Sequence, residues 1–287
     1  MISQILGLVM LVYLLVAVLF LAAELWSSPR LQSWGRVLLW AGLGVHTGAL
    51  LGRWAGSYQL AALHSAPAVF TDNLRLVILQ APLSNFYESL VFFAWTLPAL
   101  GVISFRRHLQ GYLGAVVAVL ACLLLAYASF GGVDSRIKPL MPALKSNWLL
   151  IHVVTAFLGY AGFALAFGAA ILYLLQDRRP RASLPPLAQL DRLIYRATVL
   201  GFLLLTLGIL TGAVWAETAW GRYWSWDPKE TWSLITWLIY VTLLHARLLK
   251  GWQGRRIAWL AVLGFMAVLF TYFGVSFLLT GLHSYLT

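Results

Sequence analysis

Five large aromatic residues gather in one short segment of the C-terminal third of the chain. The segment reads AETAWGRYWSWDPKETW, residues 216–232, and is called here the tryptophan loop. Its rings belong to Trp220, Tyr223, Trp224, Trp226 and Trp232. A single such ring at a membrane interface is typically an anchor, and this alternative stays open for each of them. Four rings within seven residues exceed what anchoring one helix end requires, so the cluster predicts a wide, flat apolar surface.

The residues between these rings indicate what such a surface could bind. Gly221 permits close backbone approach, and Asp227-Pro228 is typical of a turn followed by the start of a helix. Arg222 and Lys229 add positive charge. A haem presents a flat apolar porphyrin and two carboxylates, so an aromatic surface edged by cations matches both. We predict that the loop binds haem b, with Arg222 and Lys229 as partners of the propionates.

Two histidines are expected on the same side of the membrane as this loop. His152 lies near the outer end of a predicted helix, and His283 lies just past the outer end of the last one. A lone interfacial histidine is more often structural, but two at similar depth form a credible axial pair. Imidazole is a standard ligand of haem iron. We therefore predict His152 and His283 as ligands of the iron.

Two further histidines fall within predicted membrane spans, where ionisable residues are costly and point to function. His245 lies about 6 Å above the inner edge of its helix, and His46 lies roughly 18 Å above that edge. The difference in depth argues against a pair within this chain. His245 is expected to bind haem iron with a ligand from a partner chain, with His46 retained as an outside candidate for haem binding.

The elements that must position these residues are membrane helices. The chain of 287 residues is 61% hydrophobic and only 10% charged, unlike an average soluble domain. Crossing a hydrocarbon layer of roughly 30 Å takes about 20 residues of helix. The sequence predicts an all-α integral membrane protein with about eight transmembrane helices, at residues 2–25, 34–52, 86–105, 111–130, 147–175, 195–215, 230–249 and 257–279.

The distribution of basic residues predicts the orientation of these helices. Thirteen of the twenty lysines and arginines fall in alternate loops, which the positive-inside rule places in the cytoplasm. Both termini and the tryptophan loop are then extracytoplasmic, in a bacterial plasma membrane or, in a plastid, a thylakoid membrane. The net charge of +11 follows from this topology, and no nucleic-acid partner is predicted. Residues 1–287 are expected to form a single polytopic membrane domain.

Four passages resemble one known family. The passage WGRYWSWDPKETWSLITWLIYVTLLHAR is similar to the tryptophan-rich WWD signature of haem-handling proteins. Three others resemble the pattern of the CcsA/ResC family of system II cytochrome c biogenesis: PLSNFYESLVFFAW, SNWLLIHVVTAFLGYAGF and GVSFLLTGLHSYL. The stretch between Arg53 and Pro82 is longer than expected for that family.

The resemblance implies a function and roles for particular residues. It implies a subunit of a holocytochrome c synthase, or haem lyase, acting with a CcsB/ResB-type membrane protein. Such a subunit presents haem on the outer face for attachment to an apocytochrome c with a C-x-x-C-H motif. His152 and His283 would ligate the outer haem, and His245 would receive haem within the membrane. This chain would contribute no thiol, since its only cysteine, Cys122, lies in mid-helix.

Three alternatives stay open from the sequence. A CcmC-like protein that delivers haem to a chaperone, or a non-enzymatic regulator of haem synthesis, would use a similar loop. A transmembrane electron carrier would need two level pairs of buried histidines, which the predicted helix directions do not supply. A solute transporter would show broken helices and binding groups near the midplane, and these are sparse.

Overall fold

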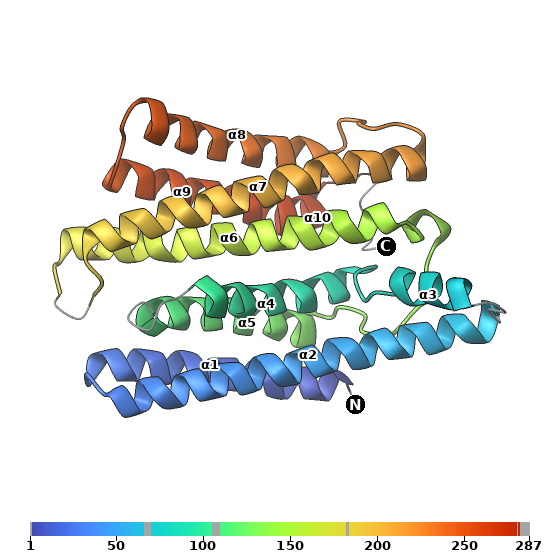
Figure 1. Ribbon diagram of the computed structural model, residues 1–287, viewed down its shortest axis with the longest axis horizontal. Helices are drawn as coiled ribbons and strands as arrows, with labels where there is room; N and C mark the ends of the chain where they lie inside the picture. Colours follow the sequence, from blue (N-terminus) through green and yellow to red (C-terminus); the bar gives the residue numbers. More distant parts are fainter. Residues whose placement is uncertain (1, 66–69, 105–109, 182–183, 280, 282–287) are drawn as a thin grey trace.

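The computed structural model describes residues 2–65, 70–104, 110–181, 184–279 and 281, and these residues are helical apart from turns and loops. Long helices lie side by side along the long axis of the molecule (Figure 1). The elements are α1 (Ile2–Leu25), α2 (Pro29–Ser65), α3 (Phe70–Leu79), α4 (Phe86–Ser104), α5 (Gln110–Phe130), η2 (Pro142–Leu144), α6 (Asn147–Arg178), α7 (Leu187–Trp220), α8 (Pro228–Leu249), α9 (Arg255–Leu269), the π-helical turn η3 (Phe270–Gly274) and α10 (Val275–Leu278).

Seven helical segments of the described chain are long and apolar enough to cross a membrane. They are Ile2–Leu25, Phe86–Ser104, Gly111–Phe130, Asn147–Arg178, Leu187–Trp220, Pro228–Leu249 and Arg255–Leu278. The prediction of an all-helical, multi-pass membrane protein is therefore confirmed. The eighth predicted span, residues 34–52, lies inside α2 but is not among the seven, because tryptophans, glycines and polar residues lower its mean hydropathy.

The stretch between the predicted spans 34–52 and 86–105 contains further helix. Helix α2 runs without interruption to Ser65, and the amphipathic α3 follows it as a separate short helix. Trp54 Nε1 donates to the Val77 carbonyl at 2.6 Å, which holds α3 against α2. The chain satisfies backbone groups of this stretch by continuing α2 and adding α3.

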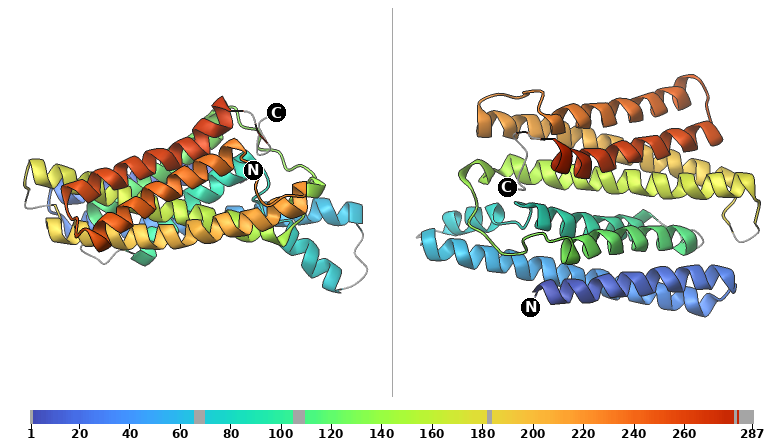
Figure 2. Two further views of the ribbon diagram at one scale, coloured as in Figure 1. Left: turned by 90° about the horizontal axis from the view of Figure 1, so that it is seen from above. Right: turned by 180° about the vertical axis from the view of Figure 1, so that it is seen from behind.

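The helices pack in groups that are visible from two sides of the molecule (Figures 1 and 2). Helix α1 packs against α2 and α5, α4 lies between α5 and α6, and α8 and α9 cover α6 and α7 on the far side. Helices α1 and α2 therefore form one edge of the bundle, and α8 and α9 form the opposite edge. The tryptophan loop joins α7 to α8.

Helices α6 and α7 approach each other especially closely. Glycines allow this: a Cβ added at Gly159 would lie 2.9 Å from the Leu205 nitrogen, and one at Gly162 would lie 3.0 Å from Gly201 Cα. Small residues permit close backbone contact between membrane helices, where dispersion forces replace the hydrophobic effect. This contact brings His152 on α6 beside the last turns of α7.

Candidate functional site

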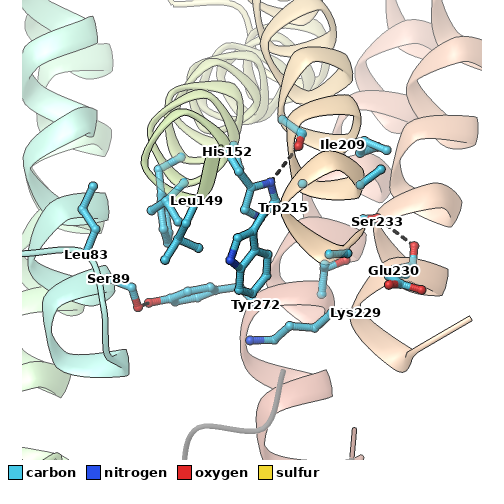
Figure 3. Close-up of a pocket in the computed structure, with 18 of the residues that line it drawn as sticks. Leu83, Ser89, Leu149, His152, Ile209, Trp215, Lys229, Glu230, Ser233 and Tyr272 are labelled. Carbon is cyan, nitrogen blue, oxygen red and sulfur yellow. Dashed lines mark hydrogen bonds between the residues drawn. The ribbon is translucent and has the colours of Figure 1, made fainter. Parts of the chain in front are cut away.

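One pocket opens among α4, α6, α7, the start of α8, η3 and α10 (Figure 3). Along α6 its lining runs from Leu149 to Tyr160, and along α7 from Leu205 to Ala216. Each stretch rises by about 16 Å at 1.5 Å per residue. The pocket therefore extends from the tryptophan loop well into the bundle, with predominantly apolar walls.

His152 stands in this pocket with its orientation fixed by α7. Its Nδ1 lies 2.7 Å from the Gly208 carbonyl oxygen. Because a carbonyl only accepts hydrogen bonds, Nδ1 carries the proton, and in the neutral ring Nε2 carries the lone pair. Histidines that bind metals are typically held in this way, by a hydrogen bond from the other ring nitrogen to a carbonyl or carboxylate. Gly212 provides the space, since a Cβ there would lie 2.5 Å from Nδ1.

A second ring holds the imidazole from the side. The Trp215 indole lies nearly parallel to the His152 ring, with centroids 6.2 Å apart and planes 14° apart. Trp215 is buried, and its Nε1 donates to the Ala143 carbonyl at 3.0 Å. Trp220 packs on Trp215 edge to face at 4.8 Å. The predicted span 195–215 ends at Trp215, and the spacing of Trp215 from Trp220 already places it near the tryptophan loop.

The tryptophan loop has a defined conformation of its own. Gly221 ends α7 in a left-handed conformation with φ of 72°, which glycine adopts without steric cost. Asp227 caps α8, and Pro228 occupies its first turn, as predicted for a helix start. Glu230 closes the capping box and also accepts from Ser225 N at 2.7 Å. This buried carboxylate ties the loop to α8, and sequence analysis missed it although the D-x-x-E spacing signals a capping box.

The structure brings only some of the predicted site residues into the pocket. His152, Tyr223, Trp224 and Lys229 line it, and Lys229 extends its amino group across it (Figure 3). Trp224 Nε1 is buried and makes no hydrogen bond within the described part of the chain. Several predicted residues of the tryptophan loop do not line the pocket. Trp220 supports Trp215, Arg222 and Trp226 are exposed, and Asp227 caps α8.

The wall of the pocket that η3 forms carries hydroxyl groups that the sequence did not single out. The π-helical turn η3 interrupts the last long helix and directs Thr271 and Tyr272 toward α8 and α4. Tyr272 and Ser89 share a hydrogen bond of 2.7 Å between their hydroxyls (Figure 3). Turns of this kind recur at functional sites because the extra residue redirects side chains.

The C-terminal histidine of the predicted pair, His283, lies outside the described residues. The nearest described position is Gly281, whose backbone lies against the Asp227 carboxylate and the Pro228 ring. The chain after α10 therefore returns to the start of α8.

His46 and His245 lie at opposite edges of the bundle. His46 on α2 is fully buried, with Nδ1 3.2 Å from the Tyr13 hydroxyl. His245 on α8 is exposed on the surface of the chain, in the last turns of the helix. Helices α2 and α8 lie at opposite edges of the molecule (Figure 1). The two histidines therefore do not share a site within this chain, and neither lines the pocket.

The sequence matches proteins of cytochrome c assembly. Residues 83–283 match the family described as Cytochrome C assembly protein. The chain belongs to this family. Proteins named Cytochrome c biogenesis protein CcsA from several organisms are similar to it. The one from Synechococcus sp. (strain JA-3-3Ab) is 36% identical over 92% of this chain and 98% of its own length. The one from Chlamydomonas reinhardtii is 44% identical over 75% of this chain and 66% of its own length.

These comparisons confirm the resemblance to the CcsA/ResC family and the assignment to cytochrome c biogenesis. A solved structure named Cytochrome c Heme Lyase CcmF has the same arrangement of helices, with a TM-score of 0.70 at 21% identity. The likeness covers 95% of this chain and 46% of that chain. At this identity the likeness shows the fold alone.

Proposed function

We propose that the pocket holds haem b as a substrate on the extracytoplasmic face and presents it for covalent attachment to an apocytochrome c. The observation that carries this proposal is the orientation of His152, whose Nδ1 is engaged by the Gly208 carbonyl. This arrangement leaves Nε2 as the ligating atom, as in other metal-bound histidines. A membrane protein of cytochrome c assembly with such an imidazole beside tryptophans has the donor that haem iron requires.

The remaining surfaces of the pocket fit the rest of the haem molecule. The aromatic and aliphatic walls suit the porphyrin, and Tyr223 offers a further ring at the mouth. The Lys229 ammonium and the buried Trp224 N–H are two donors that a propionate carboxylate can accept from. Arg222 lies exposed on the same loop and would meet a propionate that extends beyond the pocket. Trp220, Trp226 and Asp227 contribute by shaping the loop.

His283 is proposed as the second axial ligand of the iron. It follows Gly281 by two residues, a reach of at most about 7 Å, and Gly281 lies against Asp227. His152 and His283 would hold the iron from opposite faces until the histidine of the C-x-x-C-H motif replaces one of them. Each acceptor thiol then adds across a haem vinyl group: the sulfur bonds to the inner vinyl carbon and a proton to the outer one.

The pocket would promote this addition by positioning, since the chain supplies no thiol of its own to the reaction. Holding the ring and the acceptor peptide in reacting geometry removes translational and rotational freedom, worth up to roughly 7 to 11 kcal/mol in well-oriented systems. The activity is proposed for a complex, a holocytochrome c synthase formed with a CcsB/ResB-type protein. The exposed position of His245 supports a haem site completed by that partner.

We further propose that α2 crosses the membrane, which gives eight crossings and places both termini on one side. By the positive-inside rule this side is the extracytoplasmic one. Helix α2 packs along α1 in the opposite direction and extends beyond it (Figure 1). Trp34, Val37 and Trp40 on α2 are largely exposed, as expected for a lipid-facing row. The membrane would be the plasma membrane of a bacterium or the thylakoid membrane of a plastid.

The test compares haem retention by the purified protein, with and without a CcsB/ResB-type partner. Optical spectra and pyridine-haem assays would be recorded for His152→Ala, His283→Ala and His245→Ala, with Ile151→Ala as a matched control on the exposed face of α6. Loss of the haem spectrum in the first two variants, with partial recovery on adding imidazole, is expected. Full retention of haem and of cytochrome maturation in His152→Ala would refute the proposed site.

A further inference from the structure

A buried ion pair joins α2 to α4 outside the pocket. Arg53 Nε lies 2.8 Å from Glu88 Oε1, and the two side chains are only 5% and 3% exposed. Burial of two charges is costly and often contributes little net stability. The pair therefore calls for an explanation beyond holding two helices together.

The guanidinium of Arg53 also binds the loop between α5 and α6, residues 131–146. Its Nη1 donates to the Ser135 carbonyl at 2.8 Å, and its Nη2 donates to the Arg136 carbonyl at 3.4 Å. One turn further along α2, a Cβ at Gly56 would lie 3.0 Å from the Ile137 side chain. Arg53 thus fixes the main chain of this loop at its first half.

The same loop reaches the pocket at its second half. Leu144 lines the pocket, and the Ala143 carbonyl accepts from Trp215 Nε1 at 3.0 Å. Trp215 in turn lies against the imidazole of His152. A continuous set of contacts therefore runs from Arg53 through the loop to the proposed iron ligand.

The carboxylate of Glu88 holds a different wall of the pocket. Its Oε2 accepts from the main-chain nitrogen of Ser84 at 2.9 Å and from the Ser84 hydroxyl at 2.8 Å. The main-chain nitrogen of Glu88 donates to Asn85 Oδ1 at 2.9 Å. Ser84 and Asn85 both line the pocket. One ion pair thus fixes two walls that come from separate parts of the chain.

We propose that Arg53 and Glu88 are positioning residues for the haem pocket: the pair sets the relative place of the Ser84–Asn85 wall and of the loop that carries Ala143 against Trp215. This inference rests on the proposed function, because it assigns the pair a role toward haem bound by His152. Neither residue touches the substrate; both act through Trp215 and the pocket wall.

The chemistry requires arginine at position 53. The guanidinium is a planar fork with five N–H donors, and here three of its nitrogens serve one carboxylate and two carbonyls. A lysine ammonium would keep the charge beside Glu88 but not this geometry. Arg53→Lys therefore tests the hydrogen bonds to the loop carbonyls separately from the ion pair with Glu88.

The experiment uses the full chain with its CcsB/ResB-type partner. Arg53→Lys and Glu88→Gln would be compared with Arg136→Gln, which removes an exposed side chain but keeps the carbonyl that Arg53 binds. We expect about ten-fold weaker haem binding and a shifted Soret band in the first two, by analogy with the loss of groups that orient metal ligands. We also expect faster amide exchange in residues 135–146. The control should match the wild type.

Ser84→Ala is a milder variant, because it keeps the ion pair and the main-chain hydrogen bond to Glu88 and loses only the hydroxyl. It should weaken haem binding by a smaller factor without changing exchange in residues 135–146. The inference would be overturned if folded Arg53→Lys bound haem with the affinity and spectrum of the wild type. If Arg53→Lys does not fold, the same result in Ser84→Ala would overturn it. Failure of the proposed function would be seen separately, as undiminished haem binding in His152→Ala.

Discussion

Replacing Gly212 by alanine would test the support of His152 without touching the histidine itself. The added Cβ would lie 2.5 Å from Nδ1 and 2.8 Å from Cε1 of the imidazole. Since ordinary contacts are about 3.5 Å, the ring must move by about 1 Å. The 2.7 Å hydrogen bond to the Gly208 carbonyl would then stretch to as much as about 3.7 Å, beyond hydrogen-bonding range.

The magnitude follows from what that hydrogen bond does. Loss of a group that orients a metal ligand typically costs 10- to 100-fold in affinity, or about 1.4 to 2.7 kcal/mol. Alanine also favours a helix more than glycine does, so a loss of haem cannot come from a weakened α7. The assay is titration of the purified complex with haem, followed by the Soret absorbance.

Gly44→Ala is the matched control, because a Cβ at this exposed helical position would meet nothing within 4 Å. It should leave haem affinity unchanged. If Gly212→Ala bound haem as tightly as Gly44→Ala, with an unaltered spectrum, the reasoning that α7 orients His152 as an iron ligand would be refuted.

Three further predictions concern the frame of the site. Glu230→Ala removes the capping box and the hydrogen bonds to Ser225. The free energy of unfolding should fall by about 1 to 2 kcal/mol, and amide exchange in residues 221–227 should become faster. Unchanged exchange would contradict this role of Glu230. Trp215→Phe keeps a ring beside the imidazole but loses the N–H donor to the Ala143 carbonyl, so haem binding should weaken and residues 141–146 should exchange faster. Equal exchange would count against the indole hydrogen bond. Gly162→Ala would place a Cβ 3.0 Å from Gly201 Cα, so the free energy of unfolding should fall by about 1 to 3 kcal/mol. Gly48→Ala is the control, because its Cβ would have no atom within 4 Å. Equal melting temperatures of the two variants would argue against close α6–α7 packing.

Much of the candidate site was predictable because local sequence carries its chemistry. Asp227-Pro228 is typical of a helix start, and Asp227 does cap α8. His152 was expected near the outer end of its helix on the side of the tryptophan loop, and both line one pocket. These predictions succeed because caps and membrane spans depend on neighbouring residues.

Other features depended on contacts between distant segments. The Gly208 carbonyl and Gly212 lie 56 and 60 positions after His152 along the chain, and no local pattern indicates that they face it. The hydroxyl pair of Ser89 and Tyr272 joins residues 183 positions apart. The pairing of Glu88 with Arg53, 35 positions earlier, could not be inferred from spacing.

The sequence by itself determined that the chain is a helical membrane protein, because hydropathy is summed over local stretches. It also showed a tryptophan-rich loop that resembles a haem-handling motif. It also placed His245 and His46 at different depths, since helical rise is constant. Only the tertiary structure decided which of the predicted residues meet. Packing along the whole length of the helices decides which face of each helix lies against a given neighbour. For that reason His152 enters a shared pocket, whereas His46 is buried at one edge of the bundle and His245 is exposed at the other.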